Sequence, residues 1–196
     1  MRHKGLAWEE LPPPGGYGSV EYKAIVPSGN LPAMVDEGFM LADSEAIAEY
    51  LNEAYPEVAM LPDTVQLRAK AREKGRLHDT RLEPAVRAMY PQVAHETRNA
   101  DAVKAGGAEI TKHLNALALL LRDSPLDPDT LWLCDCGFAV TFAWIRAFEQ
   151  ALSLPVEWPQ SVLDYDARLQ SFAPVSDELV HYKPAMDDYL RKAYPA

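Results

Sequence analysis

The pattern of hydrophobic and polar residues changes near residue 55. Before that point the apolar runs are short and are separated by proline, glycine and acidic residues, which is typical of strands, turns and loops. Two such runs, residues 32–35 and 39–42, flank Asp36-Glu37-Gly38, and this arrangement predicts a β-hairpin in which Gly38 has a positive φ. Residues 44–51 then carry apolar side chains at the helical period, so a helix is expected there, with Asp43 or Ser44 as its N-cap.

The beginning of the chain gives shorter signals. Residues 7–11 are a strand candidate that the three prolines at 12–14 would stop. Residues 15–19 read Gly-Gly-Tyr-Gly-Ser, which is the composition of a loop. A strand, a loop, a hairpin and a helix therefore describe the chain as far as Pro56.

From about residue 61 onward the pattern is helical throughout. The first of these helices is expected to bend at Pro84, and the second is expected to be weakened by Gly106 and Gly107. The third is apolar on all sides, which predicts a buried central helix. The five predicted helices cover residues 66–90, 101–122, 135–154, 161–172 and 176–194.

The composition excludes several classes of protein. The 196 residues are 48% hydrophobic and 24% charged, as in a folded globular chain. The net charge of −10 argues against binding to nucleic acid or to an anionic membrane surface. No apolar run approaches the roughly 20 residues of a membrane span, and the N-terminus lacks the pattern of a signal peptide. The two cysteines, Cys134 and Cys136, are too close in sequence to bridge readily, which indicates a reducing compartment and a cytoplasmic protein.

The most specific signal lies between residues 26 and 56. A turn that contains proline and glycine is followed by an apolar residue that directly precedes a second proline. A hairpin comes next, and then an acidic residue and a serine that begin a helix. This order and spacing resemble the glutathione-binding region of the cytosolic glutathione transferases, in which the proline is a cis-proline. Val26 stands where asparagine is usual and Leu31 where valine or isoleucine is usual. The matching residues are Val26-Pro27-Ser28-Gly29-Asn30-Leu31-Pro32-Ala33-Met34-Val35, Gly38, Leu41-Ala42-Asp43-Ser44-Glu45-Ala46-Ile47, Tyr50-Leu51 and Tyr55-Pro56.

The resemblance implies an α/β unit followed by an all-α unit. The first would be a thioredoxin-like, glutathione-binding domain over residues 1–57, and residues 58–65 would be a linker. Residues 66–196 would form the helical C-terminal domain of a glutathione transferase. Such proteins use glutathione as a cosubstrate, and their partner is a small hydrophobic electrophile. They pair as homodimers through the hairpin region and the first long helices, so a homodimer is expected.

The matching positions suit a γ-glutamyl tripeptide. By resemblance, the backbone N–H and C=O of Leu31, next to Asn30 and before Pro32, would pair with the extended cysteinyl part of glutathione. Asp43 and Ser44 lie at a helix N-terminus, where free N–H groups and the helix dipole favour the γ-glutamyl carboxylate. The plainer interpretation is that Asp43 and Ser44 only cap the helix and that Pro32 only ends a strand.

The start of the predicted central helix has a cap of its own. Asp135 matches the family's aspartate at this point, but Trp132 stands where a serine or threonine would complete a capping box. Thr130 is a candidate substitute from one turn earlier. Cys134 and Cys136 flank the aspartate, and because no further soft ligands accompany them we expect core residues rather than a metal site.

The first long helix supplies weaker candidates for the substrate pocket. In this family it lines the cleft beside glutathione. By that resemblance His78, Arg81, Arg87 and Tyr90 are candidate contacts to the electrophile. For His78 the competing interpretation is an ordinary exposed helix histidine.

The front of the chain leaves the chemistry open. Residues 2–9 resemble the end of the family's first helix and its second strand, so we expect the first strand and most of the first helix to be missing. That segment normally carries the hydroxyl or thiol that lowers the pKa of the glutathione thiol. Three interpretations remain: a true start further upstream, a truncated chain, or replacement of that group by Tyr17 or Ser19. The function is accordingly either transfer of the glutathione thiolate, or a related isomerase or reductase reaction, or binding by a catalytically impaired member of the fold.

Overall fold

The structure is a computed structural model and describes residues 1–193. It divides into two compact units, Met1–Met60 and Leu61–Ala196. The first holds a small sheet with short helices, and the second is entirely helical in its described part. The expected order of an α/β unit followed by an all-α unit is therefore confirmed.

A two-stranded antiparallel hairpin is the sheet of the first unit. β1 (Ala33–Asp36) pairs with β2 (Phe39–Ala42), with Ala33 opposite Ala42 and Asp36 opposite Phe39. The two turn residues, Glu37 and Gly38, both have positive φ, 46° and 87°, which is the backbone of a tight hairpin turn. The hairpin and the positive φ at Gly38 are both as the sequence predicts.

The helix that follows the hairpin is α2 (Ser44–Ala54), and it packs Ile47 and Leu51 inward. Polar contacts join it to the hairpin, because the hydroxyls of Tyr50 and Tyr55 each donate to the carboxylate of Asp36 at 2.8–2.9 Å. These hydrogen bonds raise the pKa of Tyr55 to about 12. One carboxylate therefore connects the end of β1 to two points of the helical segment.

A lysine closes the other end of α2. Lys4 is the last residue of the short helix η1 (Arg2–Lys4), and its ammonium donates to the carbonyls of Tyr55 and Val58 at 2.7 and 2.5 Å. Burial lowers the pKa of this ammonium. The ammonium thus satisfies two carbonyls of the segment that follows α2, and it holds the N-terminal segment against the end of this helix.

The prediction of a strand over residues 7–11 is wrong. Among residues 1–193 the sheet contains β1 and β2 alone, so this segment has no neighbouring strand to pair with, and Leu11 is exposed. The predicted loop is followed by an unforeseen short helix, α1 (Val20–Lys23), whose N-cap is Ser19. Its single turn is too short to show a helical period in the sequence.

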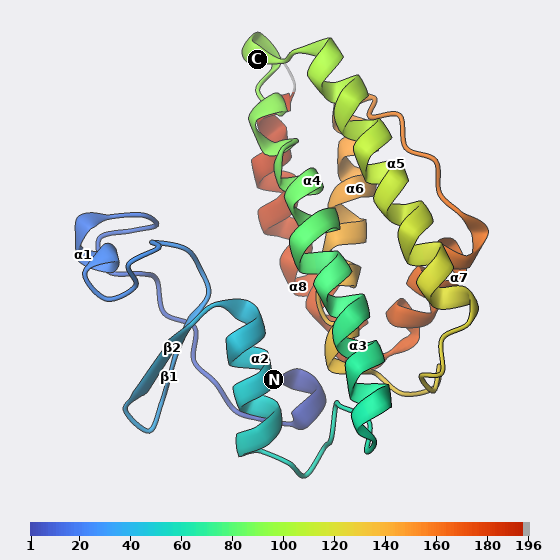
Figure 1. Cartoon of the computed structure of the whole chain (residues 1–196). Coiled ribbons are helices and arrows are strands. Elements are labelled where there is room, and N and C mark those ends of the chain that lie inside the picture. The colour runs from blue at the N-terminus through green and yellow to red at the C-terminus, as the bar shows by residue number, and fades with distance from the viewer. Residues whose placement is uncertain (194–196) are drawn as a thin grey trace. The chain divides into compact units, whose positions relative to one another are not determined.

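The second unit consists of helices around a buried central one (Figure 1). α6 (Phe138–Leu152) is that helix, and the side chains of Phe142, Ile145 and Phe148 are fully buried, as predicted. The helices that surround it are α3 (Val65–Leu77), α4 (Glu83–Arg87), α5 (Ala100–Arg122), α7 (Gln160–Ser171) and α8 (Ala173–Leu190). Short turns of helix connect them: η2 (His78–Leu82), η3 (Tyr90–Gln92), η4 (His95–Thr97), η5 (Leu133–Asp135) and η6 (Arg191–Ala193).

The interruption expected at Pro84 is present as a π-helical turn, η2, between α3 and α4. Proline has no N–H with which to reach the carbonyl of Thr80 one turn earlier. That carbonyl accepts instead from Arg81 Nη1 at 3.1 Å. The long helix predicted over residues 66–90 is thus two α-helices joined by a wider turn.

The two adjacent glycines of α5 do not interrupt it. A Cβ at Gly106 would lie 2.3 Å from the Met89 side chain, and one at Gly107 would lie 2.3 Å from the carbonyl oxygen of Pro155. Close packing against backbone therefore requires glycine at position 107, whereas at position 106 the close neighbour is the flexible end of a methionine side chain. The packing at Gly107 offsets the helix propensity that the glycines lack.

Asp135 is the polar centre of the second unit. It is 1% exposed; its Oδ2 accepts the Trp132 N–H at 2.9 Å, and its Oδ1 accepts from Lys74 at 2.6 Å and Tyr165 at 2.5 Å. The prediction that Thr130 takes the place of the missing capping hydroxyl is wrong, because the Thr130 hydroxyl donates to Asp127. The carboxylate therefore caps the 3-10 turn η5 that precedes α6, rather than α6 itself, whose N-cap is Gly137. It also neutralises a buried lysine, which the sequence did not indicate.

The two cysteines differ from one another. Cys134 is buried, and burial raises the pKa of its thiol to about 12. Cys136 is exposed, so its assignment to the core is wrong. The short 3-10 turn η5 brings the two side chains to different sides of the chain at this point, one inward and one outward. Within the described helices, none is both long and apolar enough to cross a membrane.

Candidate functional site

The loop before the hairpin is held by hydrogen bonds to Asn30. The buried Tyr22 donates its hydroxyl to the Asn30 carbonyl at 2.9 Å, and the Asn30 N–H donates to Ser28 Oγ at 3.2 Å. The Asn30 side chain accepts from the hydroxyl of Tyr17 at 3.4 Å. Gly29 turns the chain with φ 69°, and the Leu31–Pro32 peptide bond is cis.

Leu31 offers its backbone to a ligand. Its side chain is 52% exposed, and in the described part of the chain neither its N–H nor its C=O is paired with another protein group. Backbone groups in this state are available to an extended peptide that lies alongside, in the way that an added strand pairs with a sheet edge.

The start of α2 lies beside this loop. The Asp43 N–H donates to the carbonyl of Pro32 at 3.4 Å, which joins the two segments directly. Asp43 has φ 86°, in the left-handed region that non-glycine residues rarely occupy, and its carboxylate accepts from the N–H groups of Glu45 and Ala46, both at 3.1 Å. The helix start is therefore held in an unusual backbone conformation by its own cap.

Ser44, the first residue of α2, has a different role from the cap. It is exposed, and among residues 1–193 its hydroxyl and its N–H have no hydrogen-bond partner. Asp43 caps only the next two N–H groups. A hydroxyl and an N–H at the positive end of a helix form a place that suits a carboxylate.

The five residues predicted for this site belong to one connected structure. Asn30, Leu31 and Pro32 form the loop, and Asp43 and Ser44 form the helix start that is bonded to it. The plainer interpretation holds for one carboxylate oxygen of Asp43, which does cap the helix. The sequence reasoning missed Tyr22, whose hydroxyl positions Asn30, because its helix is a single turn with no helical period to mark it.

Two hydroxyls near this loop were considered as replacements for the thiol-activating group. The Ser19 hydroxyl donates to the Pro14 carbonyl at 2.6 Å and accepts the Tyr22 N–H at 3.0 Å, so it is occupied by the turn and the cap of α1. The Tyr17 hydroxyl is exposed and contacts only Asn30 Oδ1 among the described residues, at 3.4 Å. Of the two, Tyr17 alone retains a hydroxyl free to meet a ligand.

The candidates for a substrate pocket do not converge in the second unit. His78 is buried rather than exposed; its Nδ1 lies 2.8 Å from Asp79 Oδ1 and its Nε2 lies 2.8 Å from Thr141 Oγ1. Both ring nitrogens are thus engaged within the helices. Arg81 and Arg87 are exposed, and Arg87 pairs with Glu83 one turn earlier.

Tyr90 belongs to an aromatic cluster. Its ring lies 4.6 Å from that of Trp144, 5.2 Å from Phe148 and 5.3 Å from Tyr189, measured between centroids. Burial raises the pKa of its hydroxyl well above the ordinary value. A tyrosine in these surroundings stays neutral at physiological pH and contributes mainly packing.

The first unit is similar in sequence to known proteins. Residues 1–59 match the family model described as "Glutathione S-transferase, N-terminal domain". Over 75 residues the chain is 41% identical to a maleylacetoacetate isomerase of Pseudomonas aeruginosa, and the match covers 35% of each chain. It is 28% identical over 141 residues to a stringent starvation protein A homolog of Pasteurella multocida, which covers 71% of this chain and 63% of that protein. The matched part is therefore less than two thirds of the length of either relative.

A solved structure extends the likeness to both units. The holo structure of a maleyl pyruvate isomerase, described as a bacterial zeta-class glutathione S-transferase, superposes with a TM-score of 0.70 and 24% identity. The superposition covers 88% of this chain and 85% of that one. At this identity the likeness concerns the fold, a thioredoxin-like unit followed by a helical one.

Proposed function

We propose, from the premise that the chain is a member of the glutathione S-transferase family, that its first unit binds glutathione and presents the thiol to a small hydrophobic electrophile. The observation that carries the proposal is Ser44. Its hydroxyl and N–H are unpaired in the described structure, and they stand at the N-terminus of α2 beside the Leu31–Pro32 loop. The γ-glutamyl carboxylate would accept from both donors, and the cysteinyl segment would pair with the backbone of Leu31.

The proposed reaction uses the bound thiolate as the nucleophile. With a chlorinated nitroaromatic, a sulfur–carbon bond forms, chloride leaves with the bonding pair, and the thiol proton goes to solvent. With an electron-poor alkene, addition of the thiolate followed by its elimination isomerises the double bond and regenerates glutathione. Two similar proteins are named as isomerases, which makes this second form a natural one to test. The group that lowers the thiol pKa is left unassigned.

The test measures binding and turnover separately. We expect calorimetry to show glutathione binding, and Ser44→Ala to weaken it roughly 10-fold or more, because about 1.5–3 kcal/mol is lost with a hydrogen bond to a charged group. Ser161→Ala, at an exposed serine in the first turn of α7, is the matched control and should leave affinity unchanged. Equal affinities for Ser44→Ala and the unaltered protein would remove the site assignment.

A second candidate function is binding without catalysis, by a protein that has the glutathione-transferase type of fold. It is favoured by the loop beside the site: the Ser19 hydroxyl is occupied by the turn and the cap of α1, so that of Tyr17 is the one left of the two hydroxyls considered for activating the thiol. Conjugation of 1-chloro-2,4-dinitrobenzene, followed by absorbance, separates the two. Binding of glutathione together with turnover supports the enzyme, and binding without turnover of this substrate or of a cis-alkene diacid supports the binder.

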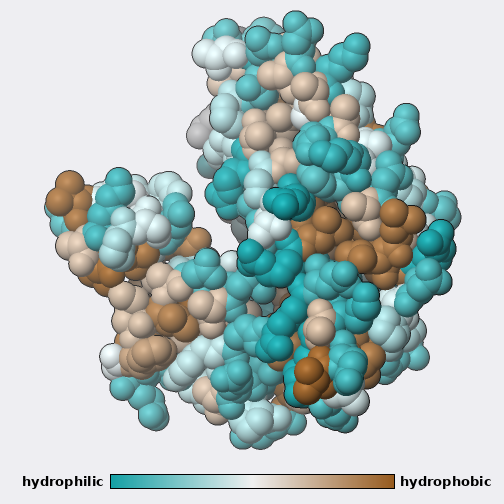
Figure 2. Space-filling view, viewed as in Figure 1, coloured by the Kyte–Doolittle hydropathy of each residue, from teal (hydrophilic) through white to brown (hydrophobic). Residues whose placement is uncertain are grey.

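We also propose a cytoplasmic homodimer. Apolar side chains lie exposed on the first unit, among them Val20 at 83%, Val35 at 69% and Phe39 at 51%, and Figure 2 shows hydrophobic surface over this unit. Exposed apolar groups on the hairpin suit an interface with a second copy. Light scattering after gel filtration gives the mass directly, and a monomer at micromolar concentration would contradict the dimer.

A further inference from the structure

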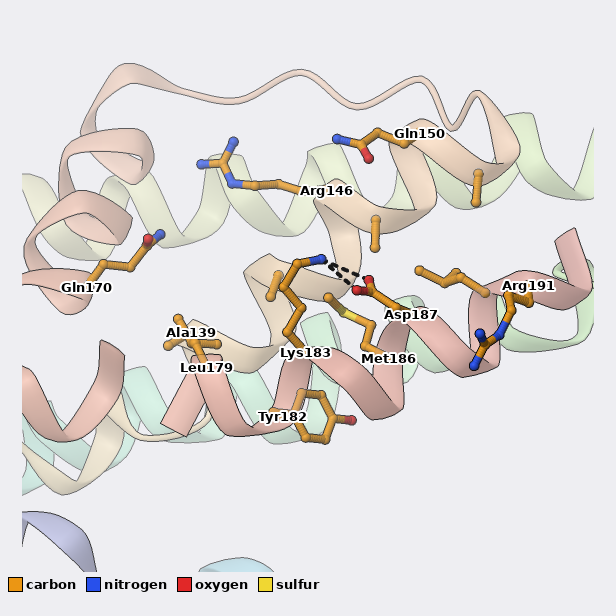
Figure 3. Close-up of a pocket in the computed structure, with 14 residues that line it drawn as sticks. Ala139, Arg146, Gln150, Gln170, Leu179, Tyr182, Lys183, Met186, Asp187 and Arg191 are labelled. Atoms are coloured by element: carbon orange, nitrogen blue, oxygen red, sulfur yellow. Dashed lines mark hydrogen bonds and ion pairs between the residues drawn. The ribbon is translucent and has the colours of Figure 1, made fainter. Parts of the chain in front are cut away.

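A cavity lies in the second unit between α6 and α8. Its volume is about 420 Å³, within the range of sites for small molecules. Figure 3 shows Arg146 and Gln150 extending from α6 above it, and Lys183, Met186 and Asp187 from α8. It shares no residue with the proposed glutathione site, all of whose members lie in the first unit.

The cavity exists because one face of α6 carries only alanine. These residues recur every four positions and so form a single row along the helix. The large side chains of α6, such as Phe142 and Phe148, are buried elsewhere in the core. From α8, Leu179, Met186 and Leu190 close the cavity with further apolar surface. The row consists of Ala139, Ala143, Ala147 and Ala151.

Three cations reach the rim of this apolar floor. Arg146 uses Nε and Nη2 on the buried Asp166, at 3.3 and 2.6 Å, so its Nη1 donors remain available. Lys183 pairs with Asp187, but both side chains are more than half exposed, and such a pair contributes only a few tenths of a kcal/mol. Arg191, at the end of the cavity, pairs with Asp188.

The lining thus contains three cations and one carboxylate, in a chain whose net charge is −10. Asp166 pairs with Arg146 and Asp188 pairs with Arg191, but neither carboxylate lines the cavity. An anion would meet donors on both walls over a floor that offers no polar group. A cation would meet Asp187 alone, already paired with Lys183.

We propose that this cavity binds small amphipathic carboxylates. The apolar body of the ligand would lie on the alanine row, and its carboxylate would accept from Arg146 Nη1 and Lys183 Nζ. The site is independent of the glutathione site, so a metabolite that occupies it would bind whether or not glutathione is present.

The test uses 4-phenylbutyrate as the probe and amide chemical shifts of the full chain as the readout. We expect saturable shifts in α6 and α8 at millimolar probe or below, unchanged when S-methylglutathione is present. 4-Phenylbutanol, which keeps the apolar body and loses the charge, should bind roughly 10-fold more weakly or worse, since a hydrogen bond to a charged group is lost. Shifts spread over the surface, absence of saturation, or equal binding of the alcohol would each overturn the proposal.

Two variants examine the floor and the rim. Ala147→Leu places a larger side chain in the middle of the alanine row, where the apolar body of the ligand would lie, and should abolish the α6 and α8 shifts. Because a larger side chain can disturb packing, Lys183→Gln provides a second measure on an exposed residue and should weaken binding about 2- to 5-fold. Lys112→Gln on α5, where the lysine also has an exposed carboxylate partner, is its matched control and should change nothing. Full binding by Ala147→Leu, or equal effects of the two lysine variants, would contradict the site.

Discussion

The two units of the chain are stabilised in different ways. The buried apolar side chains of the first unit are few, namely Tyr22, Val26, Ile47, Leu51 and Met60. Polar contacts connect its segments: Tyr22 to Asn30, Asp36 to Tyr50 and Tyr55, and Lys4 to the end of α2. The second unit has a continuous aromatic and aliphatic core, and the buried Lys74 and Asp135 are paired inside it.

The difference has a consequence for function. A site built from hydrogen bonds and a helix cap keeps donors and acceptors at the surface, where a polar tripeptide can use them. The hydrophobic core of the second unit offers no such groups, but it makes that unit rigid. The first unit does not need this core to keep its own shape. Single polar substitutions should therefore act locally in the first unit and globally in the second.

The largest expected effect is in the second unit. Asp135→Ala removes a helix cap and leaves the buried Lys74 without its counter-charge, so unfolding free energy should fall by about 3–5 kcal/mol. The cap alone, which was all that the sequence indicated, accounts for about 1–2 kcal/mol. Chemical denaturation followed by circular dichroism measures the difference. Asp123→Ala, at an exposed aspartate, is the control and should stay within about 0.5 kcal/mol. A loss of 1 kcal/mol or less for Asp135→Ala would show that the pairing contributes nothing beyond the cap.

The next effect is in the first unit and should be local. Asp43→Ala removes the acceptor for two N–H groups of α2, at a cost of about 0.5–2 kcal/mol. We expect faster amide exchange at Glu45 and Ala46 and weaker glutathione binding, with the second unit unaffected. Asp43→Asn keeps a capping oxygen and tolerates the positive φ, so it should preserve both properties. Faster exchange throughout α6 in Asp43→Ala would show that the units are not separate in this respect.

The same contrast explains which features the sequence predicted. Local signals gave the hairpin around Gly38, the cap at Asp43 and the central helix α6, because each depends on neighbouring residues or on a strong periodicity. The strand at residues 7–11 failed because a strand needs a partner that only the tertiary structure supplies.

Contacts between distant residues were outside the reach of the sequence. Lys74 and Asp135 are 61 positions apart, and His78 and Thr141 are 63 apart, so nothing local marks them as buried partners. For the site, the matching motif selected Leu31 and Ser44, and the structure added the reason why Ser44 remains available, namely that Asp43 caps the next two N–H groups. Tyr22, which positions Asn30 from α1, was not indicated because its helix is a single turn.

The smallest effect concerns pH in the first unit. The hydrogen bond to Asp36 raises the pKa of Tyr55 to about 12, and Tyr50 shifts in the same direction for the same first cause. A raised pKa means that the neutral tyrosine stabilises the fold at every pH below its ordinary value near 10, and that this contribution is lost as the pH rises from about 10 to about 12. Asp36→Asn removes the charge, so tyrosinate absorbance should appear at lower pH than in the unaltered protein.

The control is Asp63→Asn, at an exposed aspartate, which should leave the alkaline titration unchanged. Since Asp36 is bonded to residues of the first unit alone among those described, amide exchange in α6 should be the same in both variants. An Asp36→Asn titration that overlays that of the unaltered protein would mean that the tyrosines do not depend on this carboxylate. In that case the first unit would be held by its few apolar contacts, as the second unit is by its many, and the contrast between the two would be one of size only.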